Sequence, residues 1–119
     1  MVLSIKLLER EGRSTVLDYT ITLLCTKHKG GTFSLTLVES SDLGDLRHAV
    51  GKRIRSARGF VDAVLSLRDW TELDIDYDFI TDEICGPLRA LDNGFAESVV
   101  DYVETDRSGG TVGSGKMRA

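Results

Sequence analysis

Three runs in the first forty residues alternate apolar with polar side chains, and a period of two is typical of β-strands with one buried face. The runs predict strands over about 2–10 and 15–27, and a third strand that begins at Phe33. Gly12 and Gly30-Gly31 separate the runs, in segments suited to turns. Three consecutive strands with short turns form an antiparallel meander. The alternating apolar positions are Leu3, Ile5 and Leu7, then Tyr19, Ile21, Leu23 and Cys25, then Phe33, Leu35 and Leu37.

The period changes near residue 41, after which apolar side chains recur every three or four positions. This spacing lays one apolar stripe along a helix, and it predicts the longest helix of the chain over 42–67. Ser41 or Asp42 would cap the start of that helix with a side-chain oxygen. We expect the stripe to pack on the sheet; it consists of Leu43, Leu46, Val50, Ile54, Ala57, Val61, Val64 and Leu65.

Strict alternation returns in residues 73–79, where four apolar side chains take one face and three aspartates take the other. This pattern predicts a fourth strand. Pro87 has no N–H to give to a helix interior, so we expect it at a first helical position after Gly86. Asn93-Gly94 interrupts the helical spacing that follows, which leaves a C-terminal helix over about 94–105.

These elements predict a single α+β domain over residues 1–106. Its antiparallel sheet combines the three-stranded meander with the fourth strand, and it packs against the long helix and the C-terminal helix. Residues 107–119 are rich in glycine and serine, and we interpret them as a flexible tail. With 41% apolar and 29% charged residues, the composition excludes a wholly disordered chain, and no stretch is apolar enough to span a membrane.

Charge is distributed unevenly along the chain, whose net charge is −4. Residues 1–68 carry eleven Lys/Arg against seven Asp/Glu, whereas residues 69–106 carry one Arg against twelve acids. If the fold keeps these segments apart, one face is basic and another acidic. The alternative is that the two segments neutralise each other across the folded domain.

The predicted helix over 42–67 carries a basic face. At about 100° per residue, five basic or titratable side chains fall within an arc of about 140°, nearly opposite the apolar stripe. Such an arc can contact an acidic protein or the phosphates of a nucleic acid, or it can be a solvated surface. The single Trp gives no aromatic platform for stacking bases. The candidate binding residues are Arg47, His48, Lys52, Arg55 and Arg58.

Asp74, Asp76 and Asp78 would lie about 7 Å apart along one face of the predicted fourth strand, close enough to share a hard cation. A metal-assisted enzyme is therefore an alternative reading. No histidine accompanies the row, however, and like charges also protect a solvated edge strand from aggregation. We expect the second role, and we expect neither a metal nor a cofactor.

The sequence contains few candidate catalytic residues or motifs. Cys25 falls on the buried face of its strand, which favours an unreactive thiol. We interpret both Cys25 and Cys85 as small apolar residues with free thiols, and Cys85 has no base next to it in the sequence. Residues 110–116 fit the G-x-x-x-x-G-K part of a phosphate-binding loop, but Met117 stands where that loop needs Ser or Thr. No nucleophile motif is present, so we expect a protein that is not an enzyme.

We therefore expect a small non-catalytic binding or regulatory protein, of the inhibitor, immunity or accessory type, that acts by surface complementarity with a protein partner. The alternative partner is RNA or DNA, bound by the basic face of the helix over 42–67. The first residues lack the pattern of a secretory signal, so the cytosol is the expected compartment, with no membrane partner. The oligomeric state stays open, and a homodimer is one outcome.

Overall fold

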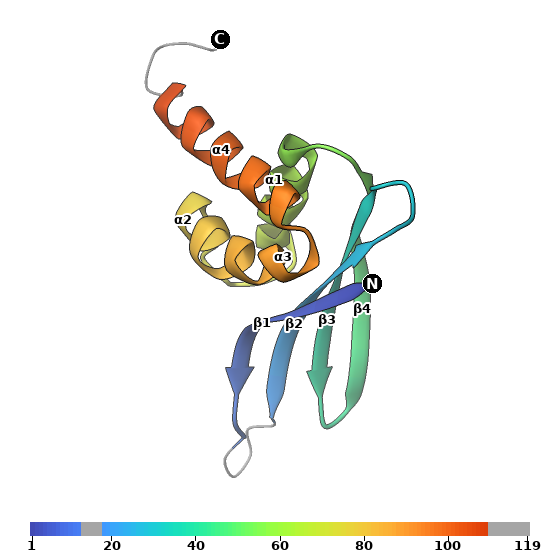
Figure 1. The fold of residues 1–119 in the computed structure, drawn as a ribbon. Coiled ribbons are helices and arrows are strands. Elements are labelled where there is room, and N and C mark those ends of the chain that lie inside the picture. Colours follow the sequence, from blue (N-terminus) through green and yellow to red (C-terminus); the bar gives the residue numbers. More distant parts are fainter. Residues whose placement is uncertain (13–17, 110–119) are drawn as a thin grey trace.

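The computed structural model describes residues 1–12 and 18–109, and Figure 1 shows its α+β architecture. Four strands come first, and all the helices follow them in the chain. The strands are β1 (Val2–Arg10), β2 (Tyr19–Lys27), β3 (Phe33–Ser41) and β4 (Gly44–Ile54). The helical elements are α1 (Ala57–Leu65), η1 (Ser66–Asp69), α2 (Tyr77–Phe79), η2 (Ile80–Ile84), α3 (Cys85–Leu91) and α4 (Asn93–Gly109).

The sheet is an antiparallel meander in the order β1-β2-β3-β4, which confirms the three predicted N-terminal strands. Alternation in β2 sorts the side chains as the sequence predicts: Ile21, Leu23 and Cys25 are buried, and the residues between them are half-buried. The described part of the second strand begins at Tyr19, and the earlier positions 15–17 lie outside the described residues.

The helices cover one face of the sheet, and only at one of its ends (Figure 1). Burial of apolar area between these two layers is the main stabilising contribution to the fold. Phe95 of α4 stacks on Phe33 of β3 with ring centroids 4.2 Å apart, and it meets Phe60 of α1 edge-on at 5.5 Å. The fully buried side chains of the helical layer include Val64, Leu67, Ile75, Ile80, Ile84, Leu88, Val99 and Val103.

The predicted helix over 42–67 is wrong in its first half, which forms β4. Two irregularities in the pairing of β3 with β4 give β4 extra residues, so its inward-facing positions fall at His48, Gly51 and Ile54. A spacing of three imitates a helix, although it arises from bulges in a strand. The helical half is confirmed from Ala57, where the Ser56 hydroxyl caps α1 by accepting from the Gly59 N–H at 3.0 Å.

The predicted strand over 73–79 is also wrong, because the fourth strand of the sheet is β4. Asp76 instead starts a helical run: its Oδ1 accepts the Phe79 N–H at 2.8 Å, and residues 77–91 continue as α2, η2 and α3. Pro87 therefore lies inside this run and not at its start. The wider π-helical turn η2, closed by the Cys85 N–H on the Ile80 carbonyl, precedes the position where Pro87 lacks an N–H.

The C-terminal helix is confirmed and is longer than the predicted 94–105. Asp92 begins it by accepting the Phe95 N–H at 3.0 Å, and α4 continues to Gly109. Arg107, which we assigned to the tail, thus belongs to α4 and pairs with Asp78 at 2.9 Å. The rest of the predicted tail, residues 110–119, lies outside the described residues, and so does the phosphate-loop string.

Candidate binding surfaces

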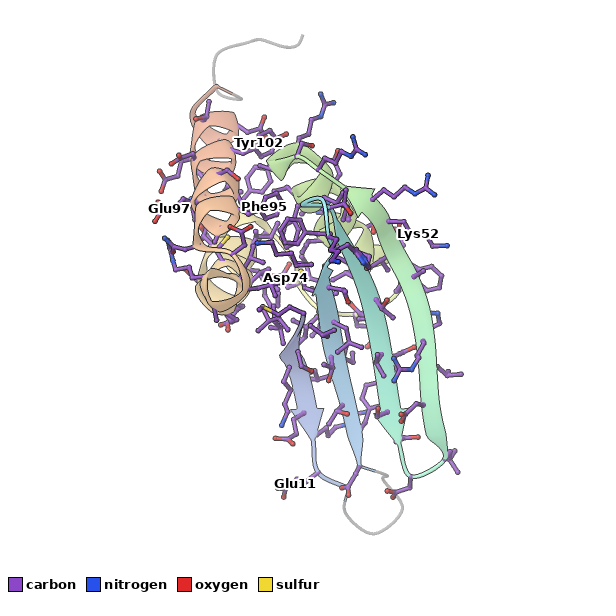
Figure 2. The ribbon with its side chains drawn as sticks, turned by 45° about the vertical axis from the view of Figure 1, so that its right-hand side comes forward. Glu11, Lys52, Asp74, Phe95, Glu97 and Tyr102 are labelled. Atoms are coloured by element: carbon purple, nitrogen blue, oxygen red, sulfur yellow. The ribbon has the colours of Figure 1, made fainter. Side chains whose placement is uncertain are left out.

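The five predicted binding residues do not share one surface, because three of them lie on the strand β4 and not on the predicted helix. Alternation along β4 sends Arg47 and Lys52 to the face of the sheet away from the helices, which we call the open face. Figure 2 shows Lys52 on the side of β4 away from α4, whereas Phe95 points from α4 towards the sheet. His48 faces the helical side, where it contacts Glu39. Arg55 follows β4, and Arg58 lies in α1 with its guanidinium 3.9 Å from Asp62.

On the helical side, the end of the sheet that carries the β3–β4 turn projects beyond the helices (Figure 1). Two adjoining depressions of 610 and 340 Å³ lie there, and both are lined by Tyr19 and Glu39. We call this region the Trp70 surface. It is formed by Arg10, Tyr19, Glu39, Leu43, Leu46, His48 and Trp70.

Large apolar side chains stand open to solvent on the Trp70 surface. Leu43 is 86% exposed, Leu46 63% and Trp70 49%. Leu46 faces the helical side because it pairs with Glu39 in the register of β3 and β4. The Trp70 ring packs on His48 with centroids 4.6 Å apart, which holds the indole against the sheet.

The centre of the Trp70 surface is polar. The Tyr19 hydroxyl donates to Glu39 Oε1 at 2.6 Å, and His48 Nε2 lies 3.0 Å from Glu39 Oε2. An ionised carboxylate can only accept, so His48 donates this second hydrogen bond. The Arg10 guanidinium lies 5.3 Å from the centre of the Tyr19 ring. Both Glu39 oxygens thus have a partner in a half-buried site.

These contacts set the protonation of the cluster. The hydrogen bond from Tyr19, and then the one from His48, hold the pKa of Glu39 below its ordinary value. Burial, together with the bond to Glu39, raises the pKa of Tyr19 to about 12. At neutral pH the cluster therefore holds a carboxylate and a protonated phenol. It offers fixed hydrogen-bonding groups to a ligand, but no activated nucleophile.

The two cysteines, Cys25 and Cys85, are both buried. Both are free thiols, and burial raises the pKa of Cys25 and of Cys85 to about 11. At neutral pH they remain protonated, and the thiolate is the form that reacts.

The aspartates of residues 73–79 do not form the predicted row. Asp76 caps α2, Asp78 pairs with Arg107, and Asp74 lies in the segment before the helical run. Within residues 1–12 and 18–109, no group of three His, Cys, Asp or Glu side chains is placed to hold a metal ion.

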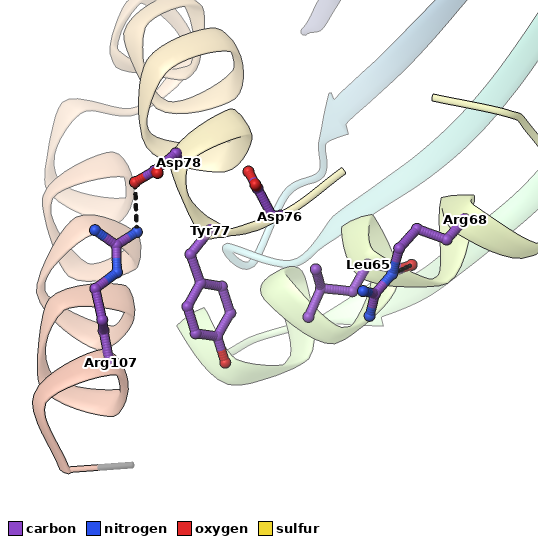
Figure 3. Close-up of a pocket in the computed structure, with 6 residues that line it drawn as sticks. All are labelled: Leu65, Arg68, Asp76, Tyr77, Asp78 and Arg107. Atoms are coloured by element: carbon purple, nitrogen blue, oxygen red, sulfur yellow. Dashed lines mark hydrogen bonds and ion pairs between the residues drawn. The ribbon is translucent and has the colours of Figure 1, made fainter. Parts of the chain in front are cut away.

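A further depression of 460 Å³ lies between α1, α2 and α4 (Figure 3). Two of its charged groups, Arg107 and Asp78, form an ion pair, and the Tyr77 hydroxyl donates to Asp106. Arg68, also on this rim, donates to the Leu65 carbonyl at 3.2 Å. This arrangement ties α4 to α2 and leaves little for a ligand to gain.

Few ion pairs join the basic segment, residues 1–68, to the acid-rich segment, residues 69–106, although Arg10 lines one depression with Asp69 and Glu72 and Arg68 lines another with Asp76 and Asp78. Of the six ion pairs between described residues, only Lys27 with Asp92, at 3.0 Å, joins residues 1–68 to residues 69–106. Most acids of the second segment lie on or before α2, α3 and α4, whereas most cations of the first lie on the strands and beside them.

The sequence analysis does not predict the Trp70 surface, although one feature of the sequence indicates it. The alternation of β3 continues past Leu37 to Glu39, which places a charged residue on the inward face. A charge at such a position needs partners, and these were Tyr19 and His48. Leu46 reaches this cluster through the register of β4, and Trp70, which follows η1, reaches it by packing on His48.

No helix in the described part of the chain is long and apolar enough to cross a membrane. Comparison with protein-family models, with curated protein sequences and with solved structures finds no match for this chain.

Proposed function

We propose that this chain is a non-catalytic binding protein whose protein partner docks on the Trp70 surface. The observation that carries the proposal is the exposure of Leu43, Leu46 and Trp70 around one polar cluster. Scattered exposed apolar residues are ordinary, but Leu43 and Leu46 line one depression and Trp70 lines the other, and apolar side chains gathered beside depressions are typical of an interaction site.

The composition of the surface fits a protein partner. Trp, Tyr and Arg are the residue types that most often dominate binding energy at protein interfaces, and Trp70, Tyr19 and Arg10 lie together here. Trp70 and Leu46 supply apolar area that a partner would bury, while the Tyr19–Glu39–His48 cluster fixes the orientation of polar contacts.

We propose that the protein acts on its partner by covering a surface or by holding it in place. This is the action of inhibitors, immunity proteins and accessory proteins, and we propose that type of role. We propose the cytosol as its compartment, because both cysteines are buried as free thiols.

The test is capture of proteins from a nuclease-treated lysate of the native host by four tagged forms of the chain. The forms are wild type, Leu46→Asp, Trp70→Ala and the control Val2→Asp. Val2 is also an exposed apolar residue of an edge strand, but it pairs with Thr26 and faces the open side. Melting curves of all four forms verify that each is folded.

We expect wild type and Val2→Asp to retain the same protein, and Leu46→Asp and Trp70→Ala to lose it. With that protein purified, titration should show Kd raised by at least tenfold in the two variants, as at interface hot spots. Equal retention by all four folded forms would exclude the Trp70 surface as the docking site. Loss of every partner after nuclease treatment would contradict a protein partner.

A further inference from the structure

The open face of the sheet carries a second surface, independent of the Trp70 surface. At the end that carries the β2–β3 turn, seven residues line a depression of 460 Å³. We call it the Lys52 groove. Its residues are His28, Thr32, Ser34, Thr36, Ala49, Lys52 and Arg53.

Two consecutive cations line this groove, which a regular strand does not allow, because successive side chains alternate between faces. Arg53 has φ +54°, the one described non-glycine residue in the left-handed region. The irregular pairing between Phe33 and Leu35 falls opposite this position. The bulge thus turns Arg53 onto the same depression as Lys52, and an unfavourable backbone conformation is retained where it gathers positive charge.

The positive charge of the groove is not neutralised within the described molecule. No described acid lies within 4.0 Å of the charged groups of Lys52, Arg53 or Arg47, which lies further along the open face. Lys29 in the β2–β3 turn and Arg55 after β4 extend the cationic region along the chain. The acid-rich segment belongs to the helical layer, on the opposite side of the sheet.

The rest of the groove is suited to phosphate oxygens. Thr32, Ser34 and Thr36 contribute hydroxyl donors, and His28 Nε2 lies 3.0 Å from Ser34 Oγ. Hydroxyl groups together with Lys and Arg are the usual contacts to a nucleic-acid backbone. No aromatic side chain except that of His28 lines the groove, so unstacked bases would find no platform.

We propose that the Lys52 groove binds the phosphate backbone of double-stranded nucleic acid without reading its sequence. A duplex presents regularly spaced phosphates to a cationic surface and needs no base stacking. The cations concerned include Arg47 and Lys52, two of the residues that the sequence singled out, now placed on a strand. The proposal does not depend on the protein partner, because the two surfaces lie on opposite faces of the sheet.

The experiment measures binding of a fluorescent 20-base-pair DNA duplex and an RNA duplex of the same sequence by anisotropy, over a series of salt concentrations. The variants are Lys52→Gln, Arg53→Gly and their combination. Arg53→Gly removes the cation while supplying the residue that best accepts a positive φ, so the fold is retained. The control is Arg89→Gln, which removes one cation from α3 in the acid-rich layer.

We expect wild type and Arg89→Gln to bind duplexes with an affinity that falls steeply with salt. Each groove substitution should weaken binding, and the double variant should lower the slope of log K against log salt by about 2. Both single variants should melt close to wild type.

Three results would overturn the proposal. The first is equal duplex affinity for the double variant and Arg89→Gln. The second is tighter binding to a single strand of the same length than to the duplex. The third is binding to phosphatidylserine vesicles or to polyglutamate with no measurable binding to duplex, which would assign the groove to a lipid surface or an acidic protein.

Discussion

Glu39 shows how one residue can organise a surface. It continues the inward-facing series of Leu35 and Leu37 on β3, where an unpaired charge would be costly. Tyr19 and His48 donate to its two oxygens, and they do so from the strands on either side. The cluster is therefore both a structural link across three strands and the polar centre of the Trp70 surface.

Tyr19→Phe should lower the free energy of unfolding by about 1 kcal/mol at pH 7, because it removes a hydrogen bond to a half-buried carboxylate. Glu39 has a lowered pKa in the fold, so this stabilisation is present above the ordinary glutamate pKa of about 4.3 and is lost as pH falls through the folded value. Urea unfolding at pH 7 and pH 3 should therefore show a smaller difference at the lower pH.

Tyr102→Phe is the matched control for that measurement, because no described hydrogen bond uses its hydroxyl. It should change stability little at either pH. An effect of Tyr19→Phe that is the same at pH 7 and pH 3 would show that the Tyr19 hydroxyl does not stabilise ionised Glu39.

Neighbouring leucines of β2 test the register of the sheet. Leu23 is fully buried against the helices and Leu24 is half-buried on the open face, as the alternation predicts. Leu23→Ala should cost about 2–5 kcal/mol and Leu24→Ala much less, measured by urea unfolding. The reverse ranking would place β2 one residue out of register.

Among the individual strands and helices, the spacing of apolar residues predicts an element correctly where the pairing of its strands is regular. The alternation in β2 and β3 and the helical spacing in α4 follow directly from the sequence. In β1 the predicted inward series holds for Leu3 and Ile5, but a bulge between Lys6 and Leu8 pairs Leu8, and not the predicted Leu7, with the buried Ile21. The prediction from local spacing failed over residues 44–54, because bulges give a strand the spacing of a helix, and a bulge depends on the partner strand. It failed again over residues 73–79, because alternation does not supply a neighbouring strand, and Asp76 is also a good helix cap.

Substitutions of Asp76 and Asp74 distinguish a helical run that begins at Asp76 from a strand over residues 73–79. Asp76→Ala should lower stability by about 1 kcal/mol, because it removes the cap of the helical run that begins at Tyr77. Asp74→Ala should have little effect, since that side chain makes no described hydrogen bond or ion pair. Thermal unfolding followed by circular dichroism measures both. Equal effects of the two substitutions would argue against a helix start at Asp76.

Across the whole molecule, the fold places many of the acids and many of the cations in different layers. The acid-rich helices lie on one face of the sheet, and the Lys52 groove lies on the other, with Lys27 and Asp92 forming the described ion pair between the two segments. Sequence counts predicted that such a separation could exist. They could not place it, because the placement depends on which face of the sheet the helices cover.

The same layering exposes the Trp70 surface. The helices are too few to cover the whole sheet, so the end with the β3–β4 turn keeps its inward face open. Apolar side chains on that end therefore face solvent in the isolated chain. We propose that a protein partner covers them.

The chain contains one tryptophan, so a label on tryptophan reports on Trp70 alone. Incorporation of 5-fluorotryptophan gives a single ¹⁹F resonance from the surface, and the purified partner is then titrated into the labelled protein. We expect this resonance to shift and broaden in proportion to complex formation, and its sensitivity to solvent exchange between H₂O and D₂O to fall. An unchanged resonance that keeps its solvent sensitivity in the saturated complex would contradict docking on the Trp70 surface.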